Sequence, residues 1–248
     1  MKISVITAVY NCEKTIGDTI NSILAQSYPN VESVVIDGLS TDGTLGVLEL
    51  YRSRLGAFIS ERDNGIYDAL NKGISYASGD VIGFLHADDV FENRDVLSKI
   101  AAIFTDADIY AVYGDLVYVK NEDVSQVIRY WKSGNYDKIT LARGWMPPHP
   151  TFYVRRSVYE QLGGFDTRYR IAADYDTVLR FLAVAKIRTA YIPEVLVRMR
   201  AGGISNRNLK NIIRKSLEDI DILRRNGVGG LFTLLQKNFR KLSQFWLR

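Results

Sequence analysis

The stretch GDVIGFLHADD, residues 79–89, decides the fold class of this chain. Its apolar run at 81–85 follows a Ser-Gly-Asp turn signal and is typical of a short strand buried on both faces. The run ends in His86 and then in Asp88 and Asp89, two adjacent carboxylates at the point where the chain leaves the core. Something must offset the charge that the sequence places there.

Strand and helix patterns alternate on the N-terminal side of this stretch. Strands are expected at 2–8, 31–36 and 57–60, and each is followed by apolar residues at helical spacing, as at 16–24 and 66–74. This alternation predicts a parallel sheet covered on both faces, with right-handed crossovers. After residue 94 the pattern changes.

The second part of the chain has fewer regular repeats. Segments 109–119 and 124–131 are expected to pair as β-strands. Helices are expected near 157–162 and from 174 to 184, before a last strand at 189–199. We therefore predict an α/β protein whose second half departs from the simple alternation.

Composition narrows the class of protein. The 248 residues are 47% hydrophobic, enough for a large core, and the single Cys12 has no partner for a disulfide within the chain. No apolar run is long enough to span a membrane, so a cytoplasmic location is expected. Residues 205–248 contain ten Lys or Arg against three Asp or Glu, a formal +7, whereas the whole chain carries +4. The body is therefore mildly acidic, which disfavours nucleic acid as a partner.

Polar residues follow the expected strands and should gather at one edge of the sheet. In open parallel sheets, ligands bind outside the carboxyl ends of the strands. Neither a G-x-G-x-x-G sequence nor a P-loop is present, so a phosphate group would have to be held differently. Two carboxylates with a nearby His can bind a divalent cation that in turn holds a diphosphate. Alternatively, Asp88 or Asp89 caps the helix expected to start near 93–95.

Five stretches together resemble a known family. They are TAVYN (7–11), VVIDGLSTDGT (34–44), ERDNGIYDALNKGI (61–74), GDVIGFLHADD (79–89) and GGFDTRYRIAADYDTVLR (163–180). In this order and spacing they resemble the inverting family 2 glycosyltransferases of the GT-A fold, over roughly residues 1–200. The resemblance implies a Rossmann-like, mostly parallel sheet flanked by helices, with an acceptor-side half after the nucleotide-binding half.

The resemblance also implies roles for single residues. Asp37 matches the acid that reads the nucleotide base, and Asp174 matches the general base that deprotonates the acceptor hydroxyl. Asp88 matches a contact to the ribose or diphosphate. The remaining nucleotide contacts implied are Thr7, Tyr10, Asn11 and Asp63. The implied ligands of a Mn²⁺ or Mg²⁺ ion are Asp89, Asp88 and His86.

Several positions leave alternatives open. His86 stands where many relatives carry the first Asp of the metal-binding motif, so it is a metal ligand, a phosphate contact or a packed side chain. Asp176 is the nearest rival of Asp174, which also suits the N-cap of the following helix. His149, between prolines, is a candidate to orient the acceptor or pyrophosphate, or it is a structural turn residue. Arg198 and Arg200 are weaker candidates for phosphate contact.

We divide the chain into a transferase domain at 1–202 and a basic helical tail at 203–248. Within the domain, 1–92 is expected to bind the nucleotide-sugar and 93–202 the acceptor. In the tail, an apolar helical face with basic residues such as Lys237 opposite suggests an anchor on an anionic membrane surface. The expected apolar face comprises Leu231, Leu235, Phe239, Leu242 and Trp246. A helix docked on the body or a dimer contact would give the same pattern.

The sequence thus predicts an enzyme that adds one sugar from a nucleotide-diphosphate donor to an acceptor hydroxyl with inversion. The Q-x-x-R-W motif of processive relatives is missing. A UDP-sugar is the favoured donor, with GDP- and dTDP-sugars open. The expected acceptor is a saccharide, and family analogy implies that it is lipid-linked, in surface polysaccharide assembly at the inner face of the cell membrane. A non-catalytic subunit that binds nucleotide-sugars or polysaccharides is the alternative.

Overall fold

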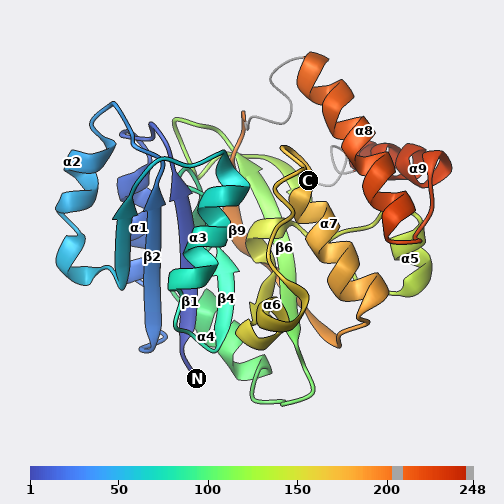
Figure 1. The fold of residues 1–248 in the computed structure, drawn as a ribbon. Helices are drawn as coiled ribbons and strands as arrows, with labels where there is room; N and C mark the ends of the chain where they lie inside the picture. Colours follow the sequence, from blue (N-terminus) through green and yellow to red (C-terminus); the bar gives the residue numbers. More distant parts are fainter. Residues whose placement is uncertain (203–208, 244–248) are drawn as a thin grey trace.

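One mixed sheet forms the centre of the molecule (Figure 1). The computed structural model describes residues 1–202 and 209–243. Within these residues the strand order is β3-β2-β1-β4-β8-β6-β9-β5, and β7 pairs with β6. The strands are β1 (Ile3–Val9), β2 (Val31–Asp37), β3 (Ala57–Ser60), β4 (Val81–Phe84), β5 (Val90–Phe91), β6 (Ala111–Val119), β7 (Val127–Trp131), β8 (Tyr153–Arg155) and β9 (Thr189–Arg200).

The first four strands form the parallel sheet that the sequence predicts. β1 lies at their centre, with Ile3 opposite both Val31 of β2 and Val81 of β4. All seven residues of β1 are buried, which explains the near-continuous apolar run. The adjacent β3 pairs in parallel with β2. These strands therefore send their carboxyl ends to one edge of the sheet.

Later strands extend this sheet in mixed directions. β8 is antiparallel to both β4 and β6, so β6 runs in the same direction as β4. β9 is parallel to β6, whereas β5 and β7 are antiparallel edge additions. The expected pairing of 109–119 with 124–131 is confirmed as β6 and β7. β5 and β8 are two and three residues long, too short for a periodic signal.

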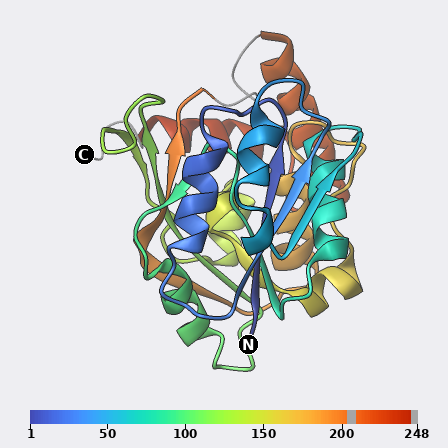
Figure 2. The ribbon, with the colours of Figure 1, turned by 90° about the vertical axis from the view of Figure 1, so that its left-hand side faces the viewer.

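Helices cover both faces of the sheet (Figures 1 and 2). On one face α1 (Ile16–Leu24), α2 (Thr44–Glu49) and α4 (Val96–Ile103) bury apolar side chains in a common cluster. The opposite face packs a second cluster, to which all the other helices contribute. They are α3 (Ile66–Tyr76), α5 (Lys138–Ala142), α6 (Arg156–Leu162), α7 (Ala173–Leu179), α8 (Leu209–Arg225) and α9 (Leu231–Ser243).

Irregular helical turns complete the described chain. The helix expected at 174–184 forms as α7 and continues as a π-helical turn, η3 (Arg180–Val184). Two 3₁₀ turns, η1 (Arg52–Arg54) and η2 (His149–Thr151), follow α2 and the proline-rich connection. The GT-A fold expected from the sequence is confirmed by this architecture and by the solved structures reported below.

The two tail helices share the core of the body. Ile222 and Leu223 of α8 and Leu234 of α9 are buried in the cluster that contains α7. Lys237, expected on a solvent-facing side, is also buried and forms an ion pair with Asp219 at 2.8 Å. The side chains of Phe239 and Leu242, and all of Trp246, lie outside the described part of the chain. No helix in the described ranges has the length and apolar character needed to cross a membrane.

Gly83 provides a test of the packing between β4 and β8. A Cβ atom at this position would lie 2.0 Å from a ring carbon of Tyr153, which is fully buried. We expect Gly83→Ala to lower the free energy of unfolding by about 1–3 kcal/mol, because the ring has no space to withdraw. Urea unfolding followed by circular dichroism measures this change.

Gly46→Ala in α2 is the matched control, because no atom lies within 4 Å of its added Cβ. It should be neutral or raise the free energy of unfolding by up to about 1 kcal/mol, since Ala favours helix over Gly. Equal destabilisation by both substitutions would contradict the packing argument.

Candidate active site

The site is built on the edge where the parallel strands end. Tyr10 and Asn11 follow β1, Asp37 ends β2, Asp63 follows β3, and the turn 86–89 follows β4. Because these strands run in the same direction, the residues after them meet at one rim of the sheet. The sequence-based grouping of these polar residues therefore matches the strand topology.

Asp37 is a fully buried acid whose oxygens are bonded by neighbouring residues. The Ser60 hydroxyl donates to its Oδ2 at 2.6 Å, and the backbone N–H of Ser40 donates to the same carboxylate. These donors fix the orientation of the carboxyl group at the end of β2. The side chain of Asp37 is therefore held in one orientation beneath this corner of the rim.

A small residue is required beside Asp37. A Cβ atom on Gly38 would lie 2.4 Å from Oδ2 of Asp63 and 3.5 Å from the ring of Tyr10. Asp63 and the exposed Tyr10 thus come together over the backbone of Gly38. Close approach of this kind is a common use of glycine. The three strand ends form one corner of the site.

Asn11 and Thr7 complete the contribution of β1. Asn11 has a left-handed backbone with φ of 53°, and its side-chain oxygen accepts the N–H of Thr41 at 2.8 Å. Thr7 is fully buried within the strand, and its hydroxyl has no hydrogen-bond partner among the described residues. Asn11 therefore shapes the rim directly, whereas Thr7 lies beneath it.

Asp89, like Asp37, is a fully buried acid of the rim. Its Oδ1 accepts the backbone N–H of Arg200 at 3.2 Å, and its Oδ2 is buried without a hydrogen-bond partner in the described chain. Burial raises the pKa of this carboxyl well above its usual range, and the adjacent charge of Asp88 adds to the effect. Asp89 therefore points into the protein.

Arg200 holds the turn that carries the two acids. Its guanidinium donates to the backbone carbonyl of Asp88 at 2.6 Å, pairs with Asp18 at 2.6 Å and donates to the carbonyl of Asn121 at 3.0 Å. Together with its backbone N–H on Asp89, these bonds tie β9 to the end of β4. The guanidinium of Arg200 is therefore engaged in bonds within the protein.

Asp88 is the more accessible of the two carboxylates. It is half-buried, and its side chain accepts no hydrogen bond from the residues that the structure describes. Its charge acts on the neighbouring His86, whose pKa is nevertheless lowered by burial. A neutral imidazole beside an unbonded carboxylate is a donor set suited to a divalent cation.

A second histidine joins the rim from the acceptor-side half. The His149 ring stacks on Phe84 with centroids 4.9 Å apart and lies 5.9 Å from the His86 ring. Burial lowers the pKa of His149 to about 4, opposed by the charge of Asp174. His149 is therefore neutral at physiological pH and packs at the junction of the two halves.

Asp174 lies close enough to this group for its charge to act on both histidines. The Tyr67 hydroxyl donates to Oδ1 of Asp174 at 3.2 Å and to the carbonyl of Ile171 at 2.8 Å. Burial, followed by the charge of Asp174, raises the pKa of Tyr67, so this hydroxyl remains a donor. The fold thus brings Asp174 to the acid turn from far along the sequence.

Asp176 occupies a different environment. It is buried, its Oδ2 pairs with Arg180 at 2.7 Å, and its Oδ1 accepts the side-chain amide of Asn226 at 3.1 Å. Both oxygens are therefore used inside the protein. This geometry distinguishes the two acids, which the sequence left as rivals.

Other arginines singled out in the sequence are likewise engaged. Arg198 pairs with Glu92 at 2.7 Å, and it donates to the carbonyl of Val124. With Arg200 bound as described above, both members of this pair maintain the connection of β9 with the loops around it.

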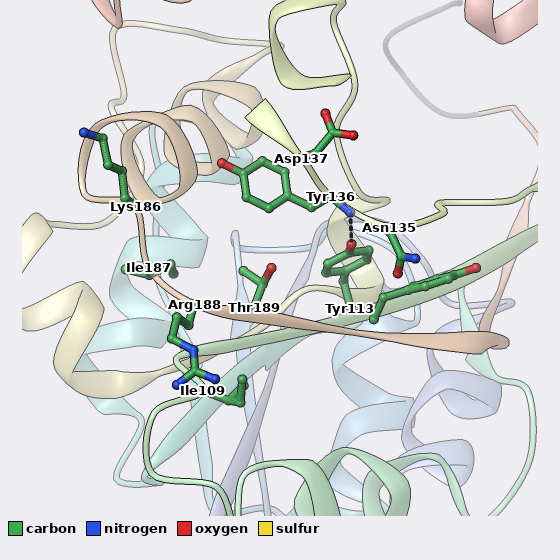
Figure 3. Close-up of a pocket in the computed structure, with 10 residues that line it drawn as sticks. Ile109, Tyr113, Asn135, Tyr136, Asp137, Lys186, Ile187, Arg188 and Thr189 are labelled. Carbon is green, nitrogen blue, oxygen red and sulfur yellow. Dashed lines mark hydrogen bonds between the residues drawn. The ribbon is translucent and has the colours of Figure 1, made fainter. Parts of the chain in front are cut away.

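A cavity of about 460 Å³ lies elsewhere, at the amino ends of β6 and β9 (Figure 3). The hydroxyl of Tyr113 accepts the N–H of Tyr136 at 2.8 Å, and the hydroxyl of Tyr136 donates to Leu182. Because β6 and β9 run parallel to the first strands, this cavity is at the edge opposite the rim. It is separate from the candidate active site.

Solved structures share this fold. TarS 1–349 of S. aureus in complex with UDP-GlcNAc matches with a TM-score of 0.66 and 21% identity over 90% of this chain and 67% of that chain. The chain spans 43% of the longer TarS chain. The mannosyltransferase PcManGT from Pyrobaculum calidifontis, in complex with GDP-Man and Mn²⁺, matches with a TM-score of 0.67 and 22% identity over 99% and 71% of the two chains.

Sheet order and these likenesses define the fold as GT-A. The family described as glycosyl transferase family 2 matches residues 4–171, and the chain belongs to it.

Two named relatives agree with the family. The putative glycosyltransferase EpsE of Bacillus subtilis (strain 168) is 34% identical over 206 residues, 80% of this chain and 73% of the relative. A PGL/p-HBAD biosynthesis glycosyltransferase of Mycobacterium bovis (strain BCG / Pasteur 1173P2) is 29% identical over 210 residues, 82% and 78% of the two chains. Glycosyl transfer is thus the activity of this class of protein.

Tyr67 is a site residue that the sequence analysis did not single out. It lies within the stretch 61–74, one of the five that resemble the family, where the sequence pattern indicates only that it belongs to a helix. Its contact with Asp174 joins residues 107 positions apart, and local periodicity carries no signal of such a contact.

His149 should make the stability of the folded protein depend on pH. Because its pKa falls to about 4 in the folded protein, the unfolded chain binds a proton that the folded chain does not between about pH 6.5 and 4. As the pH falls from 7 to 4, the free energy of unfolding of the wild type should therefore decrease by about 3 kcal/mol relative to that of His149→Phe. Urea unfolding of both proteins at pH 7, 5.5 and 4 measures the difference.

Only the change in the difference with pH is diagnostic, because the substitution also alters packing by an amount that is constant with pH. If the two stability curves run parallel from pH 7 to 4, the imidazole is not held neutral by burial.

Proposed function

We propose that this protein transfers one sugar from a nucleotide-diphosphate donor, with a UDP-sugar favoured, to an acceptor hydroxyl with inversion. The observation that carries the proposal is that Asp174, held by Tyr67, lies near enough to His86 of the acid turn 86–89 for its charge to act on that imidazole. An inverting transfer needs a base on one side of the anomeric carbon and charge neutralisation on the other. The two halves of the site supply these functions.

Asp174 is the proposed general base. Tyr67 and the backbone N–H of Tyr175 donate to its Oδ1, which leaves Oδ2 unbonded within the described chain. These donors fix the orientation of the carboxylate while the second oxygen takes the proton of the incoming hydroxyl. Asp176 has no oxygen left for this task.

Asp88 is the proposed principal ligand of a divalent cation, with His86 and Asp89 beside it. The unbonded carboxylate of Asp88 and the buried, unpartnered Oδ2 of Asp89 fit a cation at this turn. Mn²⁺ or Mg²⁺, when bound, neutralises the charge that grows on the departing diphosphate. In the described ranges, no three His, Cys, Asp or Glu side chains are grouped so that they could hold a metal ion, and this includes the set of His86, Asp88 and Asp89. Oxygens of the donor would therefore complete the ligand set.

The corner around Gly38 is the proposed nucleotide site. Asp37 is the proposed contact of the base, which would have to displace one of the donors that now bond this buried carboxyl group, Ser40 or Ser60. Asp63 would contact the nucleotide beside it. Tyr10 has an exposed ring at the same corner, and Asn11 has the left-handed backbone conformation that follows β1. Thr7 supports this corner from within the sheet.

Names and bound ligands of the relatives support the substrate class. Structures of TarS contain UDP or UDP-GlcNAc, and that of PcManGT contains GDP-Man and Mn²⁺. One relative is named for PGL/p-HBAD biosynthesis. We infer a saccharide or lipid-linked saccharide acceptor for this chain, in the assembly of a cell-surface polysaccharide.

Asp174→Asn tests the assignment of the base. The amide keeps the shape but cannot take the proton, so kcat should fall by about 10²–10⁴-fold while the donor still binds. Sugar transfer is measured with a panel of UDP-, GDP- and dTDP-sugars, and donor binding by the shift in Tm with Mn²⁺.

Asp88→Asn is the comparison variant, and it should lose the Mn²⁺-dependent part of the Tm shift. Full transfer by Asp174→Asn would exclude it as the base. A Tm shift that is the same in wild type and Asp88→Asn would remove Asp88 from the cation site.

A non-catalytic subunit that binds nucleotide-sugars or polysaccharides is the second candidate function. His86 in place of the first acid of the motif favours it, because one carboxylate is missing from the usual donor set. Slow cation-dependent hydrolysis of a nucleotide-sugar by the wild type would decide in favour of the enzyme.

We also propose that the tail helices rest on an anionic membrane on the cytoplasmic side. α9 docks on the body through Leu234 and Lys237, yet Leu231, Phe232 and Leu235 remain 61%, 73% and 48% exposed. α8 likewise exposes apolar side chains near basic residues. The apolar side chains are Ile212, Ile213 and Leu217, and the basic residues are Lys210 and Arg214. Apolar side chains beside basic ones suit the headgroup region of anionic lipids.

Replacing Leu231, Phe232 and Leu235 together by Ser should weaken binding to phosphatidylglycerol vesicles at least about 10-fold, since each loses insertion of an apolar side chain. Co-sedimentation with vesicles measures the change. Val127→Ser with Ile128→Ser, which removes apolar side chains of about half exposure from β7, is the control. Equal binding by the two variants would place the membrane contact elsewhere.

A further inference from the structure

Glu218 of α8 binds the backbone that leads to Asp174. Its Oε1 accepts the N–H of Arg170 at 3.0 Å, and its Oε2 accepts the N–H groups of Ile171 at 2.9 Å and Ala172 at 3.0 Å. One carboxylate therefore satisfies three consecutive backbone donors. Glu218 comes from the C-terminal helix pair, 46 residues beyond Ala172.

These donors belong to the three residues just before α7, the helix that carries Asp174. The first N–H groups of a helix have no partner within it, and a negative charge near them is favourable. Ala172, at the N-cap of α7, offers no side-chain cap. Glu218 thus places a negative charge near the amino end of α7 and binds the three backbone N–H groups of the chain that enters the helix.

α8 is anchored firmly enough to hold this position. Ile222 and Leu223 are fully buried, and the neighbouring Asp219 forms the buried ion pair with Lys237 of α9. The ammonium of Lys237 also lies 3.2 Å from the ring centroid of Tyr175, the residue after Asp174. The tail helices therefore contact the chain on both sides of Asp174.

A third contact comes from the same region. Asn226, just after α8, donates its amide to Asp176 at 3.1 Å. Between Glu218 and Asn226, the stretch 170–176 is bound from the tail, while Tyr67 binds it from the nucleotide-binding half through Ile171 and Asp174. Asp174 is thus held between two parts of the chain that are far apart in the sequence.

We propose that Glu218 is a positioning residue for Asp174, a role that rests on the proposed function of Asp174 as the base. Glu218 contacts neither a substrate nor a reacting atom. It fixes the backbone at 170–172, and through it the direction in which the Asp174 carboxylate points. The C-terminal helix pair is consequently part of the catalytic apparatus as well as a surface for lipid.

Glu218→Gln is the test variant because it preserves size and removes the charge. The amide retains one acceptor oxygen and turns an N–H₂ group toward the three N–H donors. We expect kcat to fall about 10-fold or more, since small misplacements of a catalytic group have large effects on rate. KM for the donor and the donor-induced Tm shift should stay within about twofold of wild type.

Amide hydrogen exchange gives a readout that does not depend on activity. In Glu218→Gln, the amides of residues 170–172 should exchange faster than in wild type, with no change at β1 or β4. Glu160→Gln, at an exposed ion pair with Arg156 on α6, is the matched control and should leave exchange at 170–172 and kcat unchanged.

Glu218→Asp keeps the charge but withdraws it by one methylene group. We expect an intermediate kcat, and this variant also serves if Glu218→Gln does not fold. Wild-type kcat in every folded variant at this position would overturn the proposal, even if exchange at 170–172 increased. A parallel rise in donor KM and fall in kcat would also overturn it, because that pattern indicates general disruption.

Failure of the positioning role can be told apart from failure of the proposed function. If Asp174→Asn is inactive and Glu218→Gln is fully active, only the role of Glu218 is wrong. If Asp174→Asn retains full transfer, the assignment of the base is wrong and the role of Glu218 falls with it.

Discussion

The burial of Asp89 is the constraint on which the site depends. A carboxylate inside a protein is costly unless donors or a positive charge meet it. Here the backbone of Arg200 donates to one oxygen, and the guanidinium of the same residue binds the carbonyl of Asp88. The last strand of the body is therefore fastened to the end of β4. This fastening leaves the carboxylate of Asp88 at the rim and the carboxylate of Asp89 beneath it.

The two halves of the site are joined by contacts of Tyr67 and of His149. Tyr67, on a helix of the first half, bonds both the proposed base and the backbone before it. His149 stacks on Phe84 at the end of β4 and approaches His86. The distance between the proposed base and the acid turn is therefore set by the packing of these side chains. Rigid support of this kind reduces reorganisation during the reaction.

Much of the fold was predictable because its signals are local. Buried parallel strands produce continuous apolar runs, and the residues after them share one edge by topology alone. Two adjacent acids give no local sign of which one turns inward, so the roles of Asp88 and Asp89 required the position of Arg200. The sequence pattern predicts that Lys237 faces solvent, whereas in the structure it is buried beside Asp219 and Tyr175. Its burial depends on contacts between segments that no periodic pattern links.

The placement of β9 has a consequence for how the chain folds during synthesis. This strand lies between β6 and β5, and pairs with both, although it is the last strand of the described chain. Until it emerges from the ribosome, β6 lacks one neighbour and Asp89 lacks its donor. Non-local pairing of this kind slows folding, because loop closure precedes the stabilising contacts. The pairing that completes this side of the candidate site is therefore delayed until β9, which ends at residue 200, has left the ribosome.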